Sequence, residues 1–233
     1  MIKRPERLEW INEMNKRPHK AAKLTIGKNT RIHDTVILGT EGVGIERGEN
    51  NAWVHCNQHG DIVIENGVHI GAYCNVKRAT LPKTATIIGE GSILCPYVNV
   101  GHNCKIGKHN FIGPHVCFNG SVEVGDCCHI GGHAVIHQHV KIGDNAIIGI
   151  GAVVVNDVSA GETVVGIPAT PIKFIGNHVH PSFNYGVNLK IGKFNHIQEG
   201  VTVGDNCTIR SFTELREGSV IGDDCYIDSG VKF

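Results

Sequence analysis

The sequence predicts an all-β protein, a parallel β-helix of six-residue repeats with a short N-terminal helix. From Ile64 to Val154 a large aliphatic residue or Phe recurs at every sixth position, with Pro82 as the exception. Glycine follows many of these positions, and the residue two places before each is small or β-branched. A phase held for so long is typical of a repeat architecture in which each hexad contributes one strand and one turn.

The place of each residue in the predicted prism explains the residue types of the hexad. The large residue fills a corner of a triangular prism, the small residue also faces inward, and glycine supplies the backbone freedom of the turn. Three hexads close one coil of about 18 residues, and stacked coils bury a continuous core. Cysteines in the small inward position are interpreted as core residues rather than nucleophiles, and they are Cys74, Cys104, Cys128, Cys207 and Cys225.

Composition narrows the class of protein. The 233 residues include 22 basic and 22 acidic side chains, so no nucleic-acid or anionic-membrane surface is expected. No apolar run is long enough to span a membrane, and the first twenty residues lack a signal-peptide core. Nine cysteines without a CxxC pair indicate free thiols in a reducing compartment. We expect a cytoplasmic protein.

Interruptions of the repeat define the expected parts of the chain. Residues 40–61 leave the hexad phase and are predicted to form a loop excursion, which on a rigid solenoid can carry function or be merely decorative. A helix over 5–16 is expected at the start. The predicted parts are an N-terminal cap on the prism (1–23), the main β-helix (24–171), a linker (172–186) and a second block of hexads (187–233).

One corner of the predicted prism gathers residues suited to catalysis. His102 follows Val100 by two positions and projects from a turn, and Gly120 lies one coil further on. His139 belongs to the same corner two coils from His102, about 10 Å away by strand spacing. A histidine is suited to act as a general base near neutral pH. A glycine N–H can approach a carbonyl oxygen closely, as an oxyanion donor must.

Several segments resemble known acyltransferases. VNVGHNCKIG at 98–107 looks like the active-site hexads of the UDP-3-O-acylglucosamine N-acyltransferase of lipid A synthesis. The region 36–170 is also similar to bacterial N-acetyltransferases acting on nucleotide-linked 4-amino-4,6-dideoxy sugars. Three further segments resemble the lipid A enzyme: Gly39–Gly44, His59–Gly71 and Ile136–Ile142. Gly166–Ala169 resembles an ending shared by many hexapeptide acetyltransferases.

The resemblance implies a left-handed helix and roles for particular residues. His102 would be the general base that takes a proton from the acceptor amine, and Gly120 would donate its N–H to the thioester oxygen. His139 would match the auxiliary histidine of the lipid A enzyme. Gly132 and Ile150 fall where the sugar N-acetyltransferases hold the pantetheine arm. Such sites lie between the subunits of a trimer, so a homotrimer is expected.

The function that follows is an acetyl-CoA-dependent N-acetyltransferase acting on the amino group of a nucleotide-linked amino-deoxy sugar, a precursor of cell-surface polysaccharide. Lys173 is expected near the cofactor phosphates, and few other basic residues surround it for docking an acidic carrier protein. Three alternatives remain open: a sugar O-acetyltransferase, an N-acyltransferase dependent on acyl carrier protein, and a non-catalytic hexapeptide scaffold.

The sequence departs from both families. The sugar N-acetyltransferases usually have an acidic residue after the base, where this chain has Asn103, and a second histidine where it has Phe111. Both families carry an N-terminal nucleotide- or uridine-binding domain, but about 23 residues precede the first coil here. The block from 187 belongs to neither family. The acceptor sugar, its nucleotide and the acyl length stay open.

Zinc chemistry is the remaining alternative for a prism rich in histidine. A γ-class carbonic anhydrase needs a histidine, a second 36 residues later and a third five beyond that. The pairs His19/His55 and His33/His69 have the first spacing, but their third positions are Gly60 and Cys74. His115 and His133 lie 18 apart, and two ligands do not make a zinc site. No metal cofactor is expected.

Overall fold

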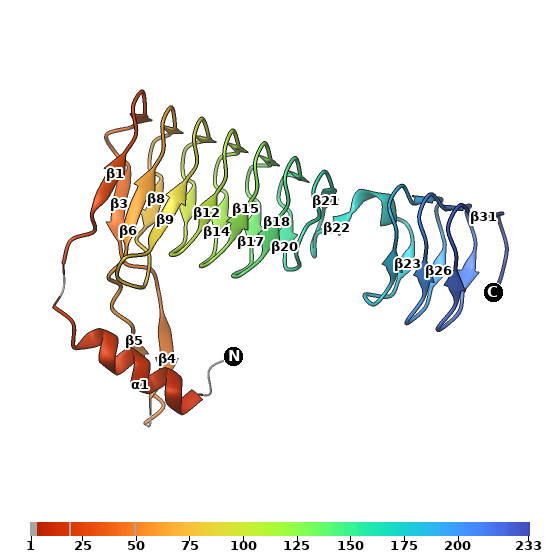
Figure 1. Ribbon diagram of the computed structural model, residues 1–233, viewed down its shortest axis with the longest axis horizontal. Helices are drawn as coiled ribbons and strands as arrows, with labels where there is room; N and C mark the ends of the chain where they lie inside the picture. The colour runs from red at the N-terminus through yellow and green to blue at the C-terminus, as the bar shows by residue number, and fades with distance from the viewer. Residues whose placement is uncertain (1–3, 19, 49) are drawn as a thin grey trace. The chain divides into compact units, whose positions relative to one another are not determined.

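The computed structural model describes residues 4–18, 20–48 and 50–233. The chain divides into two compact units, Met1–Ala169 and Thr170–Phe233, and each is described by itself. The first unit is a left-handed parallel β-helix whose coils are stacked one on another (Figure 1). The predicted fold class is therefore confirmed.

Three parallel sheets form the faces of the first unit. The first face contains β1 (Leu24–Ile26), β6 (Asp61–Ile64), β9 (Ala85–Ile88), β12 (Lys105–Ile106), β15 (Glu123–Val124) and β18 (Lys141–Ile142). The second contains β2 (Arg31–Ile32), β7 (His69–Ile70), β10 (Ile93–Leu94), β13 (Phe111–Ile112), β16 (His129–Ile130), β19 (Ile147–Ile148) and β21 (Thr163–Val165). The third contains β3 (Ile37–Thr40), β8 (Asn75–Lys77), β11 (Asn99–Val100), β14 (Cys117–Phe118), β17 (Val135–Ile136) and β20 (Val153–Val154).

Strand register shows how regular the coils are. Lys105 of β12 pairs with Glu123 of β15, eighteen residues later. Between β8 and β11 the step is longer, because Asn75 pairs with Asn99, twenty-four residues later. The additional six residues, 79–84, form bends and turns without a strand. This inserted hexad contains Pro82, the one interruption of the aliphatic series, and its length of six leaves the sequence phase unchanged.

The core of the first unit is the continuous stack of inward side chains that the hexads predict. Large residues such as Ile106 and Phe118 are buried together with small ones such as Cys104 and Ala134. Burial raises the pKa of the Cys104 thiol to about 12, and its Sγ donates to the Asn119 carbonyl at 3.0 Å. Such a thiol is not a nucleophile near neutral pH, which agrees with the core interpretation of these cysteines.

Glycine at the turns allows the backbones of adjacent coils to approach each other closely. A Cβ added at Gly101 would come 2.7 Å from the carbonyl carbon of Asn119 in the next coil, so no larger residue fits. The left-handed backbone conformation falls instead two residues later, for example at Asn103 with φ 59° and, at the next turn, at His109 with φ 55°. The expectation that the turn glycine supplies unusual φ angles is therefore wrong at these corners. Asparagine tolerates the left-handed region better than most residues.

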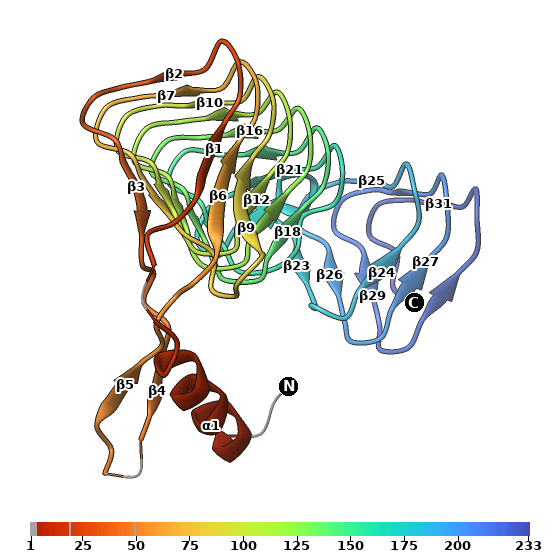
Figure 2. The same cartoon turned by 60° about the vertical axis from the view of Figure 1, so that its left-hand side comes forward.

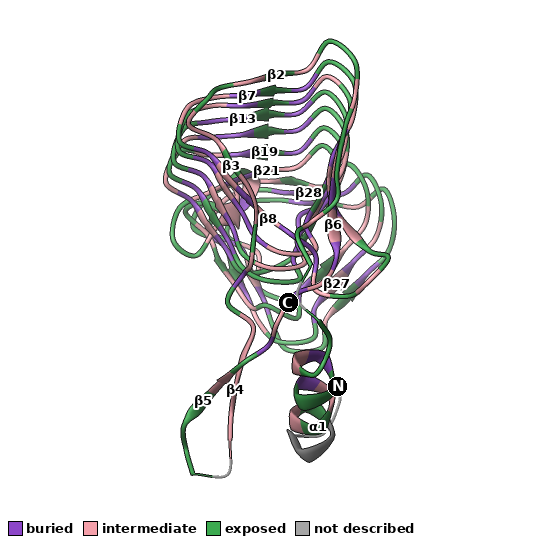
Figure 3. Ribbon diagram, turned by 90° about the vertical axis from the view of Figure 1, so that its left-hand side faces the viewer, coloured by how far each residue is buried: buried purple, intermediate pink, exposed green. Residues whose placement is uncertain are grey.

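The N-terminal helix packs on the loop excursion rather than on the end of the prism. Helix α1 (Arg4–Asn15) lies beside an antiparallel hairpin of β4 (Ile45–Arg47) and β5 (Trp53–His55), which projects from the coils (Figure 2). Buried Ile11 and Met14 of α1 contact Cys56 after the hairpin, and the buried stripe of the helix is visible in Figure 3. The Asn15 side chain also donates to the His55 carbonyl at 2.7 Å.

Residues 1–3 and 19 of the expected cap (1–23) lie outside the described residues, and the described helix α1 packs on the hairpin instead of the prism. Leu24 and Ile26 of the first strand remain 43% and 49% exposed, because the apolar side of α1 is already used by the hairpin. The excursion predicted at 40–61 thus has its own small core, formed with the helix.

The second unit is a smaller parallel helix with the same 18-residue step. It begins with β22 (Thr170–Pro171) and a 3-10 helix, η1 (Ile172–Phe174). Its three sheets contain β23 (His178–Val179), β26 (His196–Ile197) and β29 (Glu214–Leu215); β24 (Asn184–Tyr185), β27 (Thr202–Val203) and β30 (Val220–Ile221); and β25 (Lys190–Ile191), β28 (Thr208–Ile209) and β31 (Tyr226–Ile227).

Repeat structure starts earlier in this unit than the sequence predicted. The segment 172–186, expected as a linker, already contains β23 and β24, and His178 pairs with His196. Its hexads are hard to recognise because aromatic rings replace the usual aliphatic residues. Phe174 and Phe183 are buried, and the Tyr185 ring packs edge-on against Phe174 with centroids 5.1 Å apart.

Two phenylalanines of adjacent hexads test the core directly. Phe118 is fully buried, whereas Phe111 lies on the outer surface of β13 and is 41% exposed. We expect Phe118→Ala to lower the free energy of unfolding by about 3–5 kcal/mol, because it leaves a cavity in the stack. Phe111→Ala should cost much less. Chemical denaturation followed by circular dichroism measures both, and equal losses would contradict the inward and outward assignments.

Candidate active site

His102, Gly120 and His139 lie on one edge of the first unit, where the chain turns from the third face to the first. The Ser121 N–H donates to the His102 carbonyl at 2.8 Å, and the His139 N–H donates to the Gly120 carbonyl at 3.1 Å. The structure thus brings together the three residues for which catalytic roles were predicted. We call this edge the His102 corner, formed by residues 101–104, 119–122 and 137–140.

The imidazole of His102 lies directly over Gly120. A Cβ added at Gly120 would come 2.5 Å from Nε2 of His102 and would also collide with Cε1. Any side chain at position 120 would therefore displace the ring. Among the described residues, the Gly120 N–H donates no hydrogen bond. A general base beside a backbone N–H is the combination that the predicted roles of His102 and Gly120 call for.

The other ring nitrogen of His102 is held by two side chains. Thr80 Oγ1 lies 3.3 Å from Nδ1, and Asn103 Nδ2 lies 3.1 Å from it. The Asn103 amide is itself oriented, because its Oδ1 accepts from the Thr80 N–H at 2.8 Å and its Nδ2 donates to Thr80 Oγ1 at 3.1 Å. Sequence reasoning missed Thr80, whose inserted hexad shows only as the interruption at Pro82.

The position of the ring proton decides whether Nε2 can act as a base. With the proton on Nδ1, Thr80 Oγ1 accepts it and the Nε2 lone pair is free beside Gly120. With the proton on Nε2, the Asn103 amide donates to Nδ1 instead. Asparagine thus allows both tautomers, whereas a carboxylate would favour only the first. This is the physical meaning of the departure at Asn103 from the sugar N-acetyltransferase pattern.

Burial and nearby positive charge keep His102 neutral. Desolvation lowers its pKa below the ordinary value, and repulsion from His139 and Lys77 lowers it further. The unprotonated form, which a general base needs, therefore persists to lower pH than in an exposed histidine. His139 itself is exposed at its turn, which suits contact with a substrate rather than packing.

The remaining predicted residues lie elsewhere in the chain. Gly132 and Ile150 occupy the edge between the second and third faces, where the Gly151 N–H donates to the Gly132 carbonyl at 2.9 Å and Ile150 is 83% exposed. Lys173 belongs to the second unit, and its Nζ lies 4.3 Å from the centre of the Tyr185 ring. The single chain therefore carries the predicted base and the predicted pantetheine contacts on different corners.

A ladder of rings runs along the same edge as Gly132. Tyr73, Tyr97, His115 and His133 stack in that order, with centroid distances of 5.1, 4.7 and 4.8 Å. All four residues have positive φ, between 59° and 65°. The predicted adjacency of His115 and His133 is therefore present, and their rings stack on each other. Stacking stabilises the turns of this edge.

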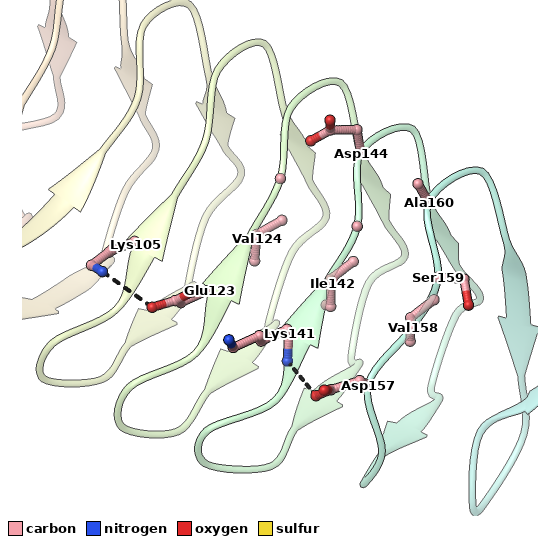
Figure 4. Close-up of a pocket in the computed structure, with 12 residues that line it drawn as sticks. Lys105, Glu123, Val124, Lys141, Ile142, Asp144, Asp157, Val158, Ser159 and Ala160 are labelled. Atoms are coloured by element: carbon pink, nitrogen blue, oxygen red, sulfur yellow. Dashed lines mark hydrogen bonds and ion pairs between the residues drawn. The ribbon is translucent and has the colours of Figure 1, made fainter.

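Figure 4 shows a hollow on the first face. Lys105 donates to Glu123 at 3.1 Å, and the Lys141 backbone N–H donates to Asp157 at 2.7 Å. None of its lining residues belongs to the His102 corner. Its charged side chains come from the first face and from the turns next to it.

Two further absences concern the described residues alone. Within residues 4–18, 20–48 and 50–233, no three His, Cys, Asp or Glu side chains are grouped closely enough to hold a metal ion. In the same part of the chain, none of the helical segments has the length and apolar character needed to cross a membrane.

Comparison with known proteins identifies related hexapeptide-repeat proteins. The protein-family model described as bacterial transferase hexapeptide (six repeats) matches residues 85–120. The matched segment includes both His102 and Gly120. The resemblance to hexapeptide-repeat acyltransferases is confirmed by this match together with the following relatives.

A UDP-3-O-acylglucosamine N-acyltransferase of Dechloromonas aromatica is 39% identical over 79 residues, which are 34% of this chain and 22% of that protein. A protein of the same name from Shewanella denitrificans is 40% identical over 84 residues, 36% of this chain and 24% of that protein. The chain thus aligns with about a quarter of the length of these relatives. A solved UDP-N-acetylglucosamine acyltransferase superposes with a TM-score of 0.57 and 29% identity, covering 64% of this chain and 55% of that one.

Replacing Asn103 by a carboxylate tests the tautomer argument. Asn103→Asp should hold the proton on Nδ1 and stabilise the imidazolium, so the pKa of His102 should rise by on the order of one unit. Since the base must be unprotonated, the acid limb of kcat/KM should move to higher pH by the same amount. Asn145→Asp is the control, because Asn145 has the same φ of 59° on another corner. An acid limb that does not move in Asn103→Asp would refute the contact with Nδ1.

Proposed function

We propose that this protein is an N-acetyltransferase that moves acetyl from acetyl-CoA to the amino group of a nucleotide-linked amino-deoxy sugar, a cytoplasmic precursor of cell-surface polysaccharide. The observation that carries the proposal is the placement of the His102 imidazole against the side-chain-free Gly120. The similarity to N-acyltransferases named for a UDP-linked sugar supports an amine on a nucleotide sugar as the acceptor.

The chemistry requires one proton transfer in each direction. His102 Nε2 takes the proton as the acceptor amine forms its bond to the thioester carbon, and the Gly120 N–H donates to the carbonyl oxygen as negative charge develops there. When the carbon–sulfur bond breaks, the protonated His102 returns the proton to the departing sulfur. His139, two turns along the same corner, would contact the acceptor.

We further propose that the protein acts as a homotrimer. His102 lies on one corner, and Gly132 and Ile150 lie on another, so a site using all three takes its parts from two chains. Exposed apolar side chains on the second face support association: Ile93 and Phe111 lie in adjacent coils and Ile147 lies two coils beyond Phe111, with His129 between them, and all three are more than 40% exposed. Exposed apolar patches of this kind commonly mark interfaces.

Removing the base is the direct test of the function. His102→Ala should lower kcat by about 10² or more, the usual scale for loss of a general base. Its melting temperature should change little, because the imidazole packs against turn backbone rather than inside the core. His139→Ala should have a weaker effect, seen mainly in the KM for the acceptor. His109→Ala, a turn residue on another corner, is the control. Full activity of His102→Ala would rule out this site.

The donor is the second point to be tested. Acyl carrier protein is the alternative donor, because the local sequence resembles the UDP-3-O-acylglucosamine N-acyltransferase of lipid A synthesis. We favour acetyl-CoA because Lys173 is the one basic residue between the Gly166–Ala169 turn and Lys190, which is little for docking an acidic carrier. Acetyl-CoA and acyl carrier protein compared at equal concentration, with one accepted acceptor, should show turnover with acetyl-CoA. Turnover with the carrier alone would reverse the assignment.

A further inference from the structure

The loop excursion reaches the candidate base. Gly42, which follows β3, is buried, and a Cβ added there would come 2.7 Å from Cδ2 of His102 and 3.2 Å from its Cβ. Cδ2 is the ring atom bonded to Nε2, and the opposite side of Nε2 faces Gly120. The reacting edge of the imidazole is therefore flanked by two glycines, one from its own corner and one from the loop.

A single side chain holds Gly42 in this place. The Gly42 N–H donates to Oε1 of Gln58 at 2.7 Å, and this bond is buried. The Gln58 backbone N–H in turn donates to Glu41 at 3.3 Å, and His55 Nε2 lies 3.3 Å from the Gly42 carbonyl. Gln58 thus connects the two ends of the excursion, before β4 and after β5.

The Nε2 end of the Gln58 amide makes no hydrogen bond that would stabilise the fold. Gln58 is fully buried, and its Nε2 has no hydrogen-bond partner among the described residues. An unsatisfied buried donor costs about 1–3 kcal/mol. A side chain present for packing alone would be better apolar, so a polar residue at this place indicates a function near the site.

We propose that Gln58 is a positioning residue for His102, which holds Gly42 against the imidazole and keeps water away from its reacting edge. The contact itself is independent of the reaction, but its effect on turnover rests on the proposed function. The excursion that projects from the prism is, by this inference, one wall of the active site.

The burial and the charged groups around His102 determine how its pKa should change when the loop opens. His139 and Lys77 face it from the prism, and both disfavour the imidazolium. On the loop, Glu41 and His55 contact the Gly42–Gln58 pair. Burial lowers the pKa of His102 more than either neighbouring charge does. Opening the loop readmits water to the ring, so the pKa should rise toward its ordinary value.

The experiment is an NMR titration of the His102 Cε1–H signal in Gln58→Met, a variant of similar size without the amide. We expect an upward pKa shift on the order of half a unit and faster hydrogen exchange of the Gly42 N–H. Val43→Ala is the control, since Val43 lies in the same loop and is 70% exposed. It should leave the titration unchanged.

A second variant keeps the test decisive if Gln58→Met disturbs the loop more widely. Gln58→Glu retains an oxygen for the Gly42 N–H, so that amide should stay protected, while the added carboxylate should raise the pKa of His102 further than Gln58→Met does. Unchanged titration of His102 in both variants would overturn the proposal, whether or not stability falls.

The titration needs no substrate, so its result does not depend on the proposed function. If acetyl transfer is also measured, the acid limb of kcat/KM should follow the NMR pKa, whereas absent turnover with a shifted pKa would reject only the function.

Discussion

The parallel pairing of each strand with the equivalent strand of the next coil, eighteen residues later in the regular coils, is the interaction on which the rest of the first unit depends. It satisfies the backbone groups of strands that are mostly two residues long, and it places equivalent positions of successive coils in direct contact. Inward positions then form one continuous core, and turn positions form continuous edges. A residue type repeated at one turn position becomes a ladder, as the four stacked rings from Tyr73 to His133 show.

The same pairing creates the candidate site, because it fixes what lies above and below each turn. His102 can lie over the next coil only because position 120 has no side chain. Its neighbours then determine its chemistry: Thr80 Oγ1 can accept a proton from Nδ1, burial lowers the pKa of the ring, and Nε2 lies beside Gly120. The loop at Gly42 closes the ring from the remaining side. The His102 corner and the loop that carries Gly42 thus contact the same imidazole from different sides.

The part of this account that the sequence could predict is the part governed by the hexad phase. The phase alone places His102, Gly120 and His139 on one corner, and the structure agrees. It could not place Thr80, since an inserted hexad of six residues leaves the phase intact. Nor could it find Gly42 and Gln58, because their contacts join segments with no repeat between them. The position of α1 depended on a tertiary choice between the prism end and the hairpin, which local patterns do not encode.

The central claim is that His102 presents an unprotonated Nε2 to the corner, and the nitrogen NMR spectrum of its ring measures this most directly. In protein labelled with nitrogen-15, at a pH well above the His102 pKa, the account predicts that the proton resides on Nδ1, where Thr80 accepts it, and that Nε2 shows the shift of a bare ring nitrogen. A ring protonated on Nε2, with Asn103 donating to Nδ1, would contradict the assignment of His102 as the base.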